Sequence, residues 1–315
     1  MSLLDACATH YRLTGYSLRP LAGGVTEHTY LLERPSAPVL VLRVETIGVG
    51  GMSANEGVLL ALEAQGYPAP RVVRARDGSA AVEVGGRRLV VTTFVEGRLA
   101  DSEANTPESL FGIGRAIGRL HALRLPALPE ADFMSTERVA GAEARLRSME
   151  GRVPPQVRSR FDEIRRLLAE TPTFTQTAGC LIHNDCHPGN AILRPDGEIV
   201  LIDWDGAGLG HPALDLGFLL ITADTYTPDV PAVGTSDERV HAIVDGYSEA
   251  RLPDRSELQA LGAAICYRVT LINAGGVAHL IERGEPERIE EWWWNGCEMA
   301  ESLAERARRR FDDYR

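Results

Sequence analysis

Residues 181–216 read LIHNDCHPGNAILRPDGEIVLIDWDGAGLGHPALDL, and they place polar side chains between short apolar runs. Asp185 and Asn190 lie five residues apart with a Pro-Gly pair between them, which predicts a tight loop rather than a helix. The apolar runs AIL and IVLI flank a Pro-Asp-Gly turn and predict a hairpin that returns Asp203 to this loop. Phosphoryl transfer needs an acid that orients a hydroxyl group, with an amide and a second acid that hold Mg²⁺. This stretch supplies all three groups.

The segments HNDCHPGN, LIDWD and PALDL, in this order and spacing, resemble the catalytic loop and metal-binding segment of the aminoglycoside phosphotransferase family. These are small-molecule kinases with a protein-kinase-like fold, related to homoserine-kinase-like and choline-kinase-like proteins. The resemblance implies that Asp185 is the catalytic acid/base and that Asn190 and Asp203 bind Mg²⁺. It also implies that His183 supports the loop and that Asp215 braces it. The phosphoryl donor would be ATP, with GTP as the alternative.

Other polar residues lie beside these motif positions. Asp205 follows Asp203 by two residues, so both carboxylates face the same way on an extended segment, and Asp205 contacts either the metal or the substrate. His187 either packs in the loop or touches substrate or phosphate.

Upstream, apolar runs predict antiparallel strands at residues 16–20, 29–32 and 39–44. Gly23 and Gly24 lie between the first two strands, where backbone amides could approach the phosphates of a nucleotide. A glycine pair is also ordinary turn chemistry, so both interpretations stay open.

The chain contains no lysine, because all of its 33 basic residues are arginine. Arg43 lies in the strand VLVLRV, at the place where kinase-like folds carry the lysine that holds the α- and β-phosphates. A guanidinium can bind phosphate oxygens in bidentate fashion, so Arg43 is expected to take this role. Glu56 opens the next helix and either forms a capping box with Ser53 or pairs with Arg43.

The segment FVEG ends a later strand and resembles the hinge between the two lobes of the family. Backbone groups of Thr93, Phe94 and Val95 would then meet the adenine edge. The resulting division is an N-terminal nucleotide-binding lobe of residues 1–96 and a C-terminal catalytic and acceptor-binding lobe of residues 97–315.

The periodicity of apolar residues becomes helical after residue 106. His121, which ends the first helical stretch, is expected to be a packed or capping histidine. Further helices are predicted at residues 155–170, 238–250, 255–274 and 287–311. The fold class is therefore α+β and bilobal, with a small N-terminal antiparallel sheet lobe that carries one helix and a larger, mainly helical C-terminal lobe.

Composition limits the partners. The net charge of -11 argues against nucleic acid, since phosphate backbones are bound by surplus cations. Residues 206–305 contain 17 acidic residues and six arginines, which fits either a cationic acceptor or ordinary solubility. The five cysteines are scattered, which is typical of a reduced, cytoplasmic protein without a zinc site. No signal peptide is apparent, and the apolar runs noted are too short to cross a bilayer, so we expect no membrane partner. We further expect the protein to be a monomer or a homodimer.

Three consecutive tryptophans, Trp292, Trp293 and Trp294, fall within the last predicted helix. Neighbours on a helix point about 100° apart, so they cannot all face the core. One of them would stack on a sugar or a cation of the acceptor, or else the group serves core packing or self-association.

The sequence thus favours an ATP- and Mg²⁺-dependent kinase that phosphorylates a hydroxyl group of a small molecule. The gap between Asp203 and Asp215 leaves no room for the activation segment of a protein kinase. The acidic region fits an aminoglycoside-like acceptor, whereas residues 75–97 resemble metabolite kinases of the homoserine or methylthioribose type, and an amino-alcohol acceptor is a related alternative. A nucleotide-binding pseudokinase that serves as a scaffold is the non-enzymatic alternative.

Overall fold

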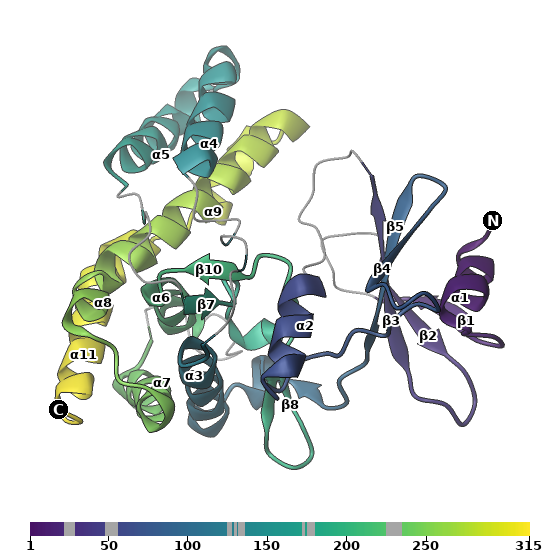
Figure 1. The fold of residues 1–315 in the computed structure, drawn as a ribbon. Coiled ribbons are helices and arrows are strands. Elements are labelled where there is room, and N and C mark those ends of the chain that lie inside the picture. Colours follow the sequence, from purple (N-terminus) through teal and green to yellow (C-terminus); the bar gives the residue numbers. More distant parts are fainter. Residues whose placement is uncertain are drawn as a thin grey trace. The chain divides into compact units, whose positions relative to one another are not determined.

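The computed structural model describes residues 1–21, 29–47, 56–124, 128, 131, 136–171, 174, 180–224 and 235–315 (Figure 1). Gly23, Gly24 and Ser53 lie outside these ranges. The chain forms two compact units, one made of residues 1–98 and 192–206 and the other of residues 99–191 and 207–315.

Residues 192–206 pack with the first unit, although the sequence placed them in the C-terminal lobe. Trp204 is buried there, and its ring lies edge-on to Tyr67 with 5.9 Å between ring centroids. Its indole nitrogen donates a hydrogen bond of 2.9 Å to the Leu201 carbonyl. A large aromatic side chain therefore fixes the segment that carries Asp203.

The first unit is built on a five-stranded antiparallel sheet (Figure 1). Its strand order is β1-β2-β3-β5-β4, with β1 at Ser17–Pro20, β2 at Thr29–Glu33, β3 at Leu40–Thr46, β4 at Ala81–Val84 and β5 at Arg87–Thr93. Every second residue of β3 is buried: Leu40, Leu42 and Val44 pack in one apolar cluster with Cys7 and Tyr11. Arg43 therefore lies on the opposite face of the sheet.

Two helices belong to the described part of the first unit, whereas the sequence predicted one. Helix α2 spans Glu56–Ala64, and the additional helix α1 spans Leu3–Tyr11. A capping box between Ser2 and Asp5 begins α1. The helix is short, and burial against the sheet stabilises it more than its own periodicity does, which explains why the pattern did not reveal it.

The second unit is mainly helical. Its strands β7 (Cys180–Ile182) and β10 (Gly208–Gly210) pair antiparallel. Strands β6 (Arg98–Leu99), β8 (Ala191–Leu193) and β9 (Ile199–Leu201) form a small three-stranded sheet in the order β6-β8-β9. The described α-helices of the second unit are α3 (Pro107–His121), α4 (Thr136–Ser148), α5 (Arg158–Glu170), α6 (Ala213–Thr222), α7 (Asp237–Ala250), α8 (Arg255–Gln259), α9 (Leu261–Arg283), α10 (Ile289–Trp292) and α11 (Gly296–Asp312).

Helices α3 and α7 touch through their backbones. A Cβ atom on Gly114 would overlap the Ile243 carbonyl, and one on Gly246 would overlap the Phe111 carbonyl. Glycine at these two positions therefore permits the close approach that brings the end of α3 to Tyr247 of α7.

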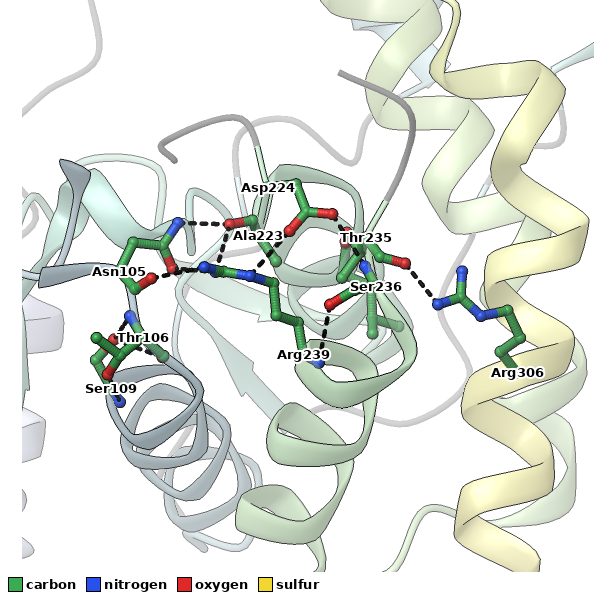
Figure 2. A network of polar contacts seen from close by, with 10 residues as sticks. Asn105, Thr106, Ser109, Ala223, Asp224, Thr235, Ser236, Arg239 and Arg306 are labelled. Atoms are coloured by element: carbon green, nitrogen blue, oxygen red, sulfur yellow. Dashed lines mark hydrogen bonds and ion pairs between the residues drawn. The ribbon is translucent and has the colours of Figure 1, made fainter. Parts of the chain in front are cut away.

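A polar network joins α6 and α7 to the residues before α3 (Figure 2). The Arg239 guanidinium contacts the buried Asp224 carboxylate at 3.1 Å and donates hydrogen bonds of 2.9 and 2.8 Å to the Asn105 side chain and carbonyl. Asp224 in turn accepts the backbone N–H of Ser236 at 3.0 Å. These contacts compensate the charge of Arg239, whose side chain is 12% exposed.

Helix α9 is the central core helix of the second unit. It has 23 residues and a mean hydropathy of 1.3 in its most apolar window, so by length and composition it is a candidate membrane span. The apolar runs noted in the sequence were all shorter than this helix. However, 72% of that window is buried inside the protein, as expected for a helix packed among other helices.

Several predicted helices end elsewhere in the structure. The predicted helix at 255–274 divides after Gln259 and continues to Arg283, where Gly284 adopts a left-handed C-cap with φ of 75°. The predicted helix at 287–311 consists of a 3₁₀ turn, α10 and α11. Trp293 adopts an extended backbone there, so the three tryptophans do not share one helix.

Candidate active site

Asp215 braces the loop that follows β7. Its carboxylate accepts the backbone N–H groups of His183 at 2.7 Å and Asn184 at 2.6 Å. Asn184 adopts a left-handed backbone with φ of 66°, a conformation that asparagine tolerates better than most residues. The two hydrogen bonds therefore hold a turn with an uncommon backbone directly before Asp185.

The Asp215 carboxylate also contacts His121, the last residue of α3. The His121 Nε2 atom lies 3.0 Å from Asp215 Oδ2, and its Nδ1 atom lies 2.9 Å from the Tyr247 hydroxyl. Burial by itself raises the pKa of Asp215, but the hydrogen bond with His121 and the nearby histidines lower it below its ordinary value. His121 is thus a packed histidine, as expected, and its partner is the brace of the loop.

Asp185 lies at the centre of the loop with its side chain partly exposed. The Asn190 amide donates to Asp185 Oδ2 at 2.8 Å, and the Arg268 guanidinium donates to Asp185 Oδ1 at 3.2 Å. Burial raises the pKa of Asp185, but the nearby His187 and the charge of Arg268 outweigh it and lower the pKa to about 2. Asp185 is therefore a carboxylate at neutral pH.

The remaining loop residues support this arrangement. His183 is buried, and its Nδ1 atom accepts the Asp185 N–H at 3.3 Å. His187 caps a 3₁₀ turn at Pro188–Asn190 by accepting the Gly189 N–H at 3.1 Å, and its Nε2 atom lies 3.7 Å from Asp185 Oδ2. Both histidines therefore contact the loop that holds Asp185.

Arg268 is the residue of this site that sequence reasoning missed. It lies on α9 and is 4% exposed, and its partner Asp185 is 83 positions away in the chain. One signal was available: Arg268 is the only Asp, Glu, Lys or Arg between residues 261 and 281. A single charge in so apolar a helix indicates a buried partner.

In the first unit, Arg43 binds the segment that follows β9. Its guanidinium forms a bidentate contact with Asp205, and its Nη1 atom lies 3.6 Å from Asp203 Oδ1. The Asp205 side chain is 5% exposed, whereas that of Asp203 is 48% exposed. Asp203 has a left-handed backbone with φ of 63°, a strained conformation that is common at functional sites.

The expected pairing of Arg43 with Glu56 is wrong in this structure. Glu56 forms its ion pair with Arg88 of β5, which also contacts Glu45 at 3.2 Å. Arg88 and Glu45 are directly opposed across β3 and β5, so the sheet register places this arginine near the beginning of α2. Arg43 thus pairs with Asp205, and Arg88 pairs with Glu56.

The predicted adenine-binding stretch follows β5. The backbone N–H of Thr93 donates to the Arg71 carbonyl at 2.9 Å, and that of Phe94 donates to the Val39 carbonyl at 3.2 Å. Phe94 is exposed, and Val95 is half-buried.

Two of the three tryptophans have partners within the second unit. The Arg160 guanidinium stacks on the Trp293 ring at 4.7 Å, and the Trp293 side chain packs beside an apolar cluster. The Trp294 backbone exchanges two hydrogen bonds with the Asn273 side chain, at 2.9 and 3.1 Å. The Trp292 side chain lies outside the described part of the structure. Trp293 therefore already stacks on a cation of the protein itself.

Much of the acidic surplus of residues 206–305 is neutralised by arginines from outside that stretch. Seven carboxylates of the described residues form such ion pairs: Glu249 with Arg115, Glu282 with Arg145, Glu290 with Arg160, Asp237 with Arg306, Glu301 and Glu305 with Arg308, and Asp245 with Arg310. The count of charges along the sequence therefore overstates the negative charge that a cationic acceptor would meet.

A model of the phosphotransferase enzyme family matches residues 17–261. A homoserine kinase of Methylobacterium radiotolerans is 29% identical over 266 residues, which are 81% of this chain and 79% of that protein. Another homoserine kinase, of Azorhizobium caulinodans, is 25% identical over 282 residues, which cover 85% of this chain and 84% of that protein.

Solved structures have the same fold. A spectinomycin phosphotransferase in complex with ADP and spectinomycin has a TM-score of 0.67 and 15% identity, and the match covers 98% of this chain and 97% of that one. A microcompartment-associated aminopropanol kinase has a TM-score of 0.63 and 21% identity, covering 96% of this chain and 97% of that one. The expected α+β fold, with an antiparallel sheet near the N-terminus and a mainly helical remainder, is confirmed.

Proposed function

The chain belongs to the phosphotransferase enzyme family, and we propose that it transfers the γ-phosphoryl group of ATP, with Mg²⁺, to a hydroxyl group of a small molecule. The observation that carries this proposal is the setting of Asp185. It is a partly exposed carboxylate that contacts Asn190 and Arg268, in a loop that Asp215 braces.

Asp185 would orient the acceptor hydroxyl and accept its proton. With a pKa of about 2 it is a weak base, so its main contribution is alignment of the nucleophile. This suits phosphoryl transfer, in which most analyses describe a loose transition state.

Asn190 and Asp203 would hold Mg²⁺, with Asp205 next to Asp203. Amide and carboxylate oxygens are the ligands that Mg²⁺ prefers, and the exposed carboxylate of Asp203 fits this requirement. When bound, the ion would neutralise charge on the transferring phosphates. Arg43 would then exchange part of its contact with Asp205 for phosphate oxygens, because one guanidinium can bind either group in bidentate fashion.

The adenine edge would meet the backbone after β5. Since the N–H groups of Thr93 and Phe94 already donate to carbonyl groups of the first unit, the N–H of Val95 is the expected donor. Glu56 would act through its pair with Arg88 and hold α2 against the sheet.

For the acceptor we propose a small amino-alcohol or hydroxy amino acid of the homoserine type. The two homoserine kinases align with four-fifths or more of this chain, which supports this choice. An aminoglycoside-like acceptor is the second candidate, motivated by the acidic residues 206–305, but the ion pairs described above weaken that argument. Cationic stacking on Trp293 is also less favoured, since Arg160 occupies that role.

The experiment measures ADP release with a panel of homoserine, aminopropanol and aminoglycosides, at several Mg²⁺ concentrations. We expect turnover with a homoserine-type acceptor, and Asp185→Ala should lower kcat by about 10²- to 10⁴-fold because the acceptor hydroxyl loses its partner. Asp162→Ala, an exposed position on α5, is the matched control and should behave as wild type.

Equal kcat for Asp185→Ala and wild type would overturn the assigned role. ATP binding without turnover on any acceptor would favour the scaffold alternative instead.

A further inference from the structure

Arg268 carries one of the most deeply buried charges in the described part of the protein. It lies in the middle of α9 and is 4% exposed, among apolar residues that form the core of the second unit. An uncompensated charge in such a place would be strongly destabilising, so the partners of Arg268 explain its position.

Its guanidinium contacts Asp185 and Phe218. The Nη2 atom donates to Asp185 Oδ1 at 3.2 Å, and the guanidinium carbon lies 4.3 Å from the centre of the Phe218 ring. Phe218 belongs to α6, the helix that also carries Asp215, and its ring lies edge-on to His187 with 5.8 Å between ring centroids. The arginine is thus held by stacking on one side while it reaches Asp185 on the other.

Its position differs from that of Asn190, which also donates to Asp185. Asn190 binds Oδ2, whereas Arg268 binds Oδ1, so the two donors fix both oxygens and therefore the plane of the carboxylate. Asn190 comes from the same short loop and moves with it. Arg268 comes from a 23-residue core helix, so it holds the Asp185 carboxylate from outside the loop.

We propose that Arg268 is the positioning residue of the phosphoryl-transfer site, which locks the Asp185 carboxylate in the orientation that aligns the acceptor hydroxyl. This inference rests on the proposed function, because it takes Asp185 as the residue that meets the acceptor. Lysine would not replace it fully, because an ammonium group presents no planar face to Phe218. The role is carried by α9, far from the motif that supplies every other group of the loop.

The test compares Arg268→Met, Arg268→Lys and Asp185→Asn with the double variant Arg268→Met/Asp185→Asn. We expect Arg268→Met to lower kcat about 10²-fold, since a misplaced catalytic group costs about this much, while the KM for ATP changes less than twofold. Arg268→Lys should recover part of the loss. In the Asp185→Asn background, Arg268→Met should cause little further loss of kcat, because the group on which it acts is gone.

Arg239→Met is the matched control, since Arg239 is also a largely buried arginine of the second unit that pairs with a buried aspartate, Asp224 (Figure 2). It should lower the urea midpoint of unfolding and leave kcat within twofold of wild type. A purely structural Arg268 would behave in the same way. Unchanged kcat in Arg268→Met, or a full additional loss in the double variant, would overturn the proposal.

Failure of the proposed function gives a different result. In that case the wild type transfers no phosphoryl group to any acceptor. Urea unfolding of wild type, Arg268→Met, Asp185→Asn and the double variant still measures the Arg268–Asp185 interaction. We expect the midpoint shifts of these two single variants to be non-additive in the double variant. Additive shifts would show that the two side chains do not interact and would contradict the inference without reference to activity.

Discussion

At the scale of single residues, hydrogen bonds between side chains and backbone groups of residues 183–215 hold the loop around Asp185. Asp185 and Asn190 contact each other as their spacing suggested, and Asp215 accepts two backbone N–H groups of the same loop. Arg268 and Arg88 were missed, since each reaches its partner from a distant part of the chain. Spacing along a sequence encodes local geometry, whereas a contact between distant elements depends on how those elements pack.

Asp215→Asn tests the brace. An asparagine at this buried position has only one oxygen, so a backbone N–H of His183 or Asn184 would face an amide NH₂ group. We expect a loss of about 1–3 kcal/mol in the free energy of unfolding, the cost of leaving a buried polar group unsatisfied, and a lower kcat. Urea unfolding at pH 7 measures the first effect. Asp196→Asn is the control, because Asp196 lies in an exposed turn and should shift stability by less than about 0.5 kcal/mol. An Asp215→Asn variant as stable as this control would contradict the bracing role.

At the scale of elements, strand and helix types followed from periodicity, but boundaries and pairings did not. The strands predicted at residues 16–20, 29–32 and 39–44 correspond to β1, β2 and β3, and the register of β3 with β5 places Glu45 opposite Arg88. The sequence offered Arg43 as the partner of Glu56 because the family order suggested it. In the structure, Arg88 and Arg43 lie on the same face of the sheet, and Glu56 of α2 forms its ion pair with Arg88.

The pairing of α2 with β5 leads to a double-mutant prediction. Glu56→Gln and Arg88→Gln should show non-additive losses of stability, because each removes the same ion pair. Glu56→Gln and Arg43→Gln should instead be additive, since Arg43 binds Asp205. Thermal unfolding of the single and double variants measures both sets. A strong coupling between Glu56 and Arg43, and none between Glu56 and Arg88, would restore the pairing expected from the sequence.

At the scale of the whole molecule, arginine side chains form ion pairs with many carboxylates of this acidic chain. Many carboxylates have a pKa below the ordinary value because an arginine binds them: Glu33 with Arg19, Asp237 with Arg306, Glu282 with Arg145, and Glu285 with Arg288. A chain without lysine places a planar, bidentate donor at every cationic position. The net charge of -11 thus coexists with extensive local pairing.

This pairing predicts how stability depends on pH. A carboxylate whose pKa is lower in the folded than in the unfolded chain contributes stability above its unfolded pKa, near 4, and loses it as pH falls through the folded pKa. We therefore expect the free energy of unfolding to be nearly constant between pH 6 and 8 and to fall steadily below about pH 4.5. Asp224, whose pKa is raised by burial despite Arg239, acts in the opposite direction but is a single group. Urea midpoints at pH 7, 5, 4 and 3 measure the trend.

Because the pairs with Glu33 and Glu282 are exposed, 0.5 M salt should weaken them and make the loss of stability at acid pH shallower. A midpoint that stays constant down to pH 3 would contradict the prediction, since it would mean that these carboxylates titrate alike in the folded and unfolded chains.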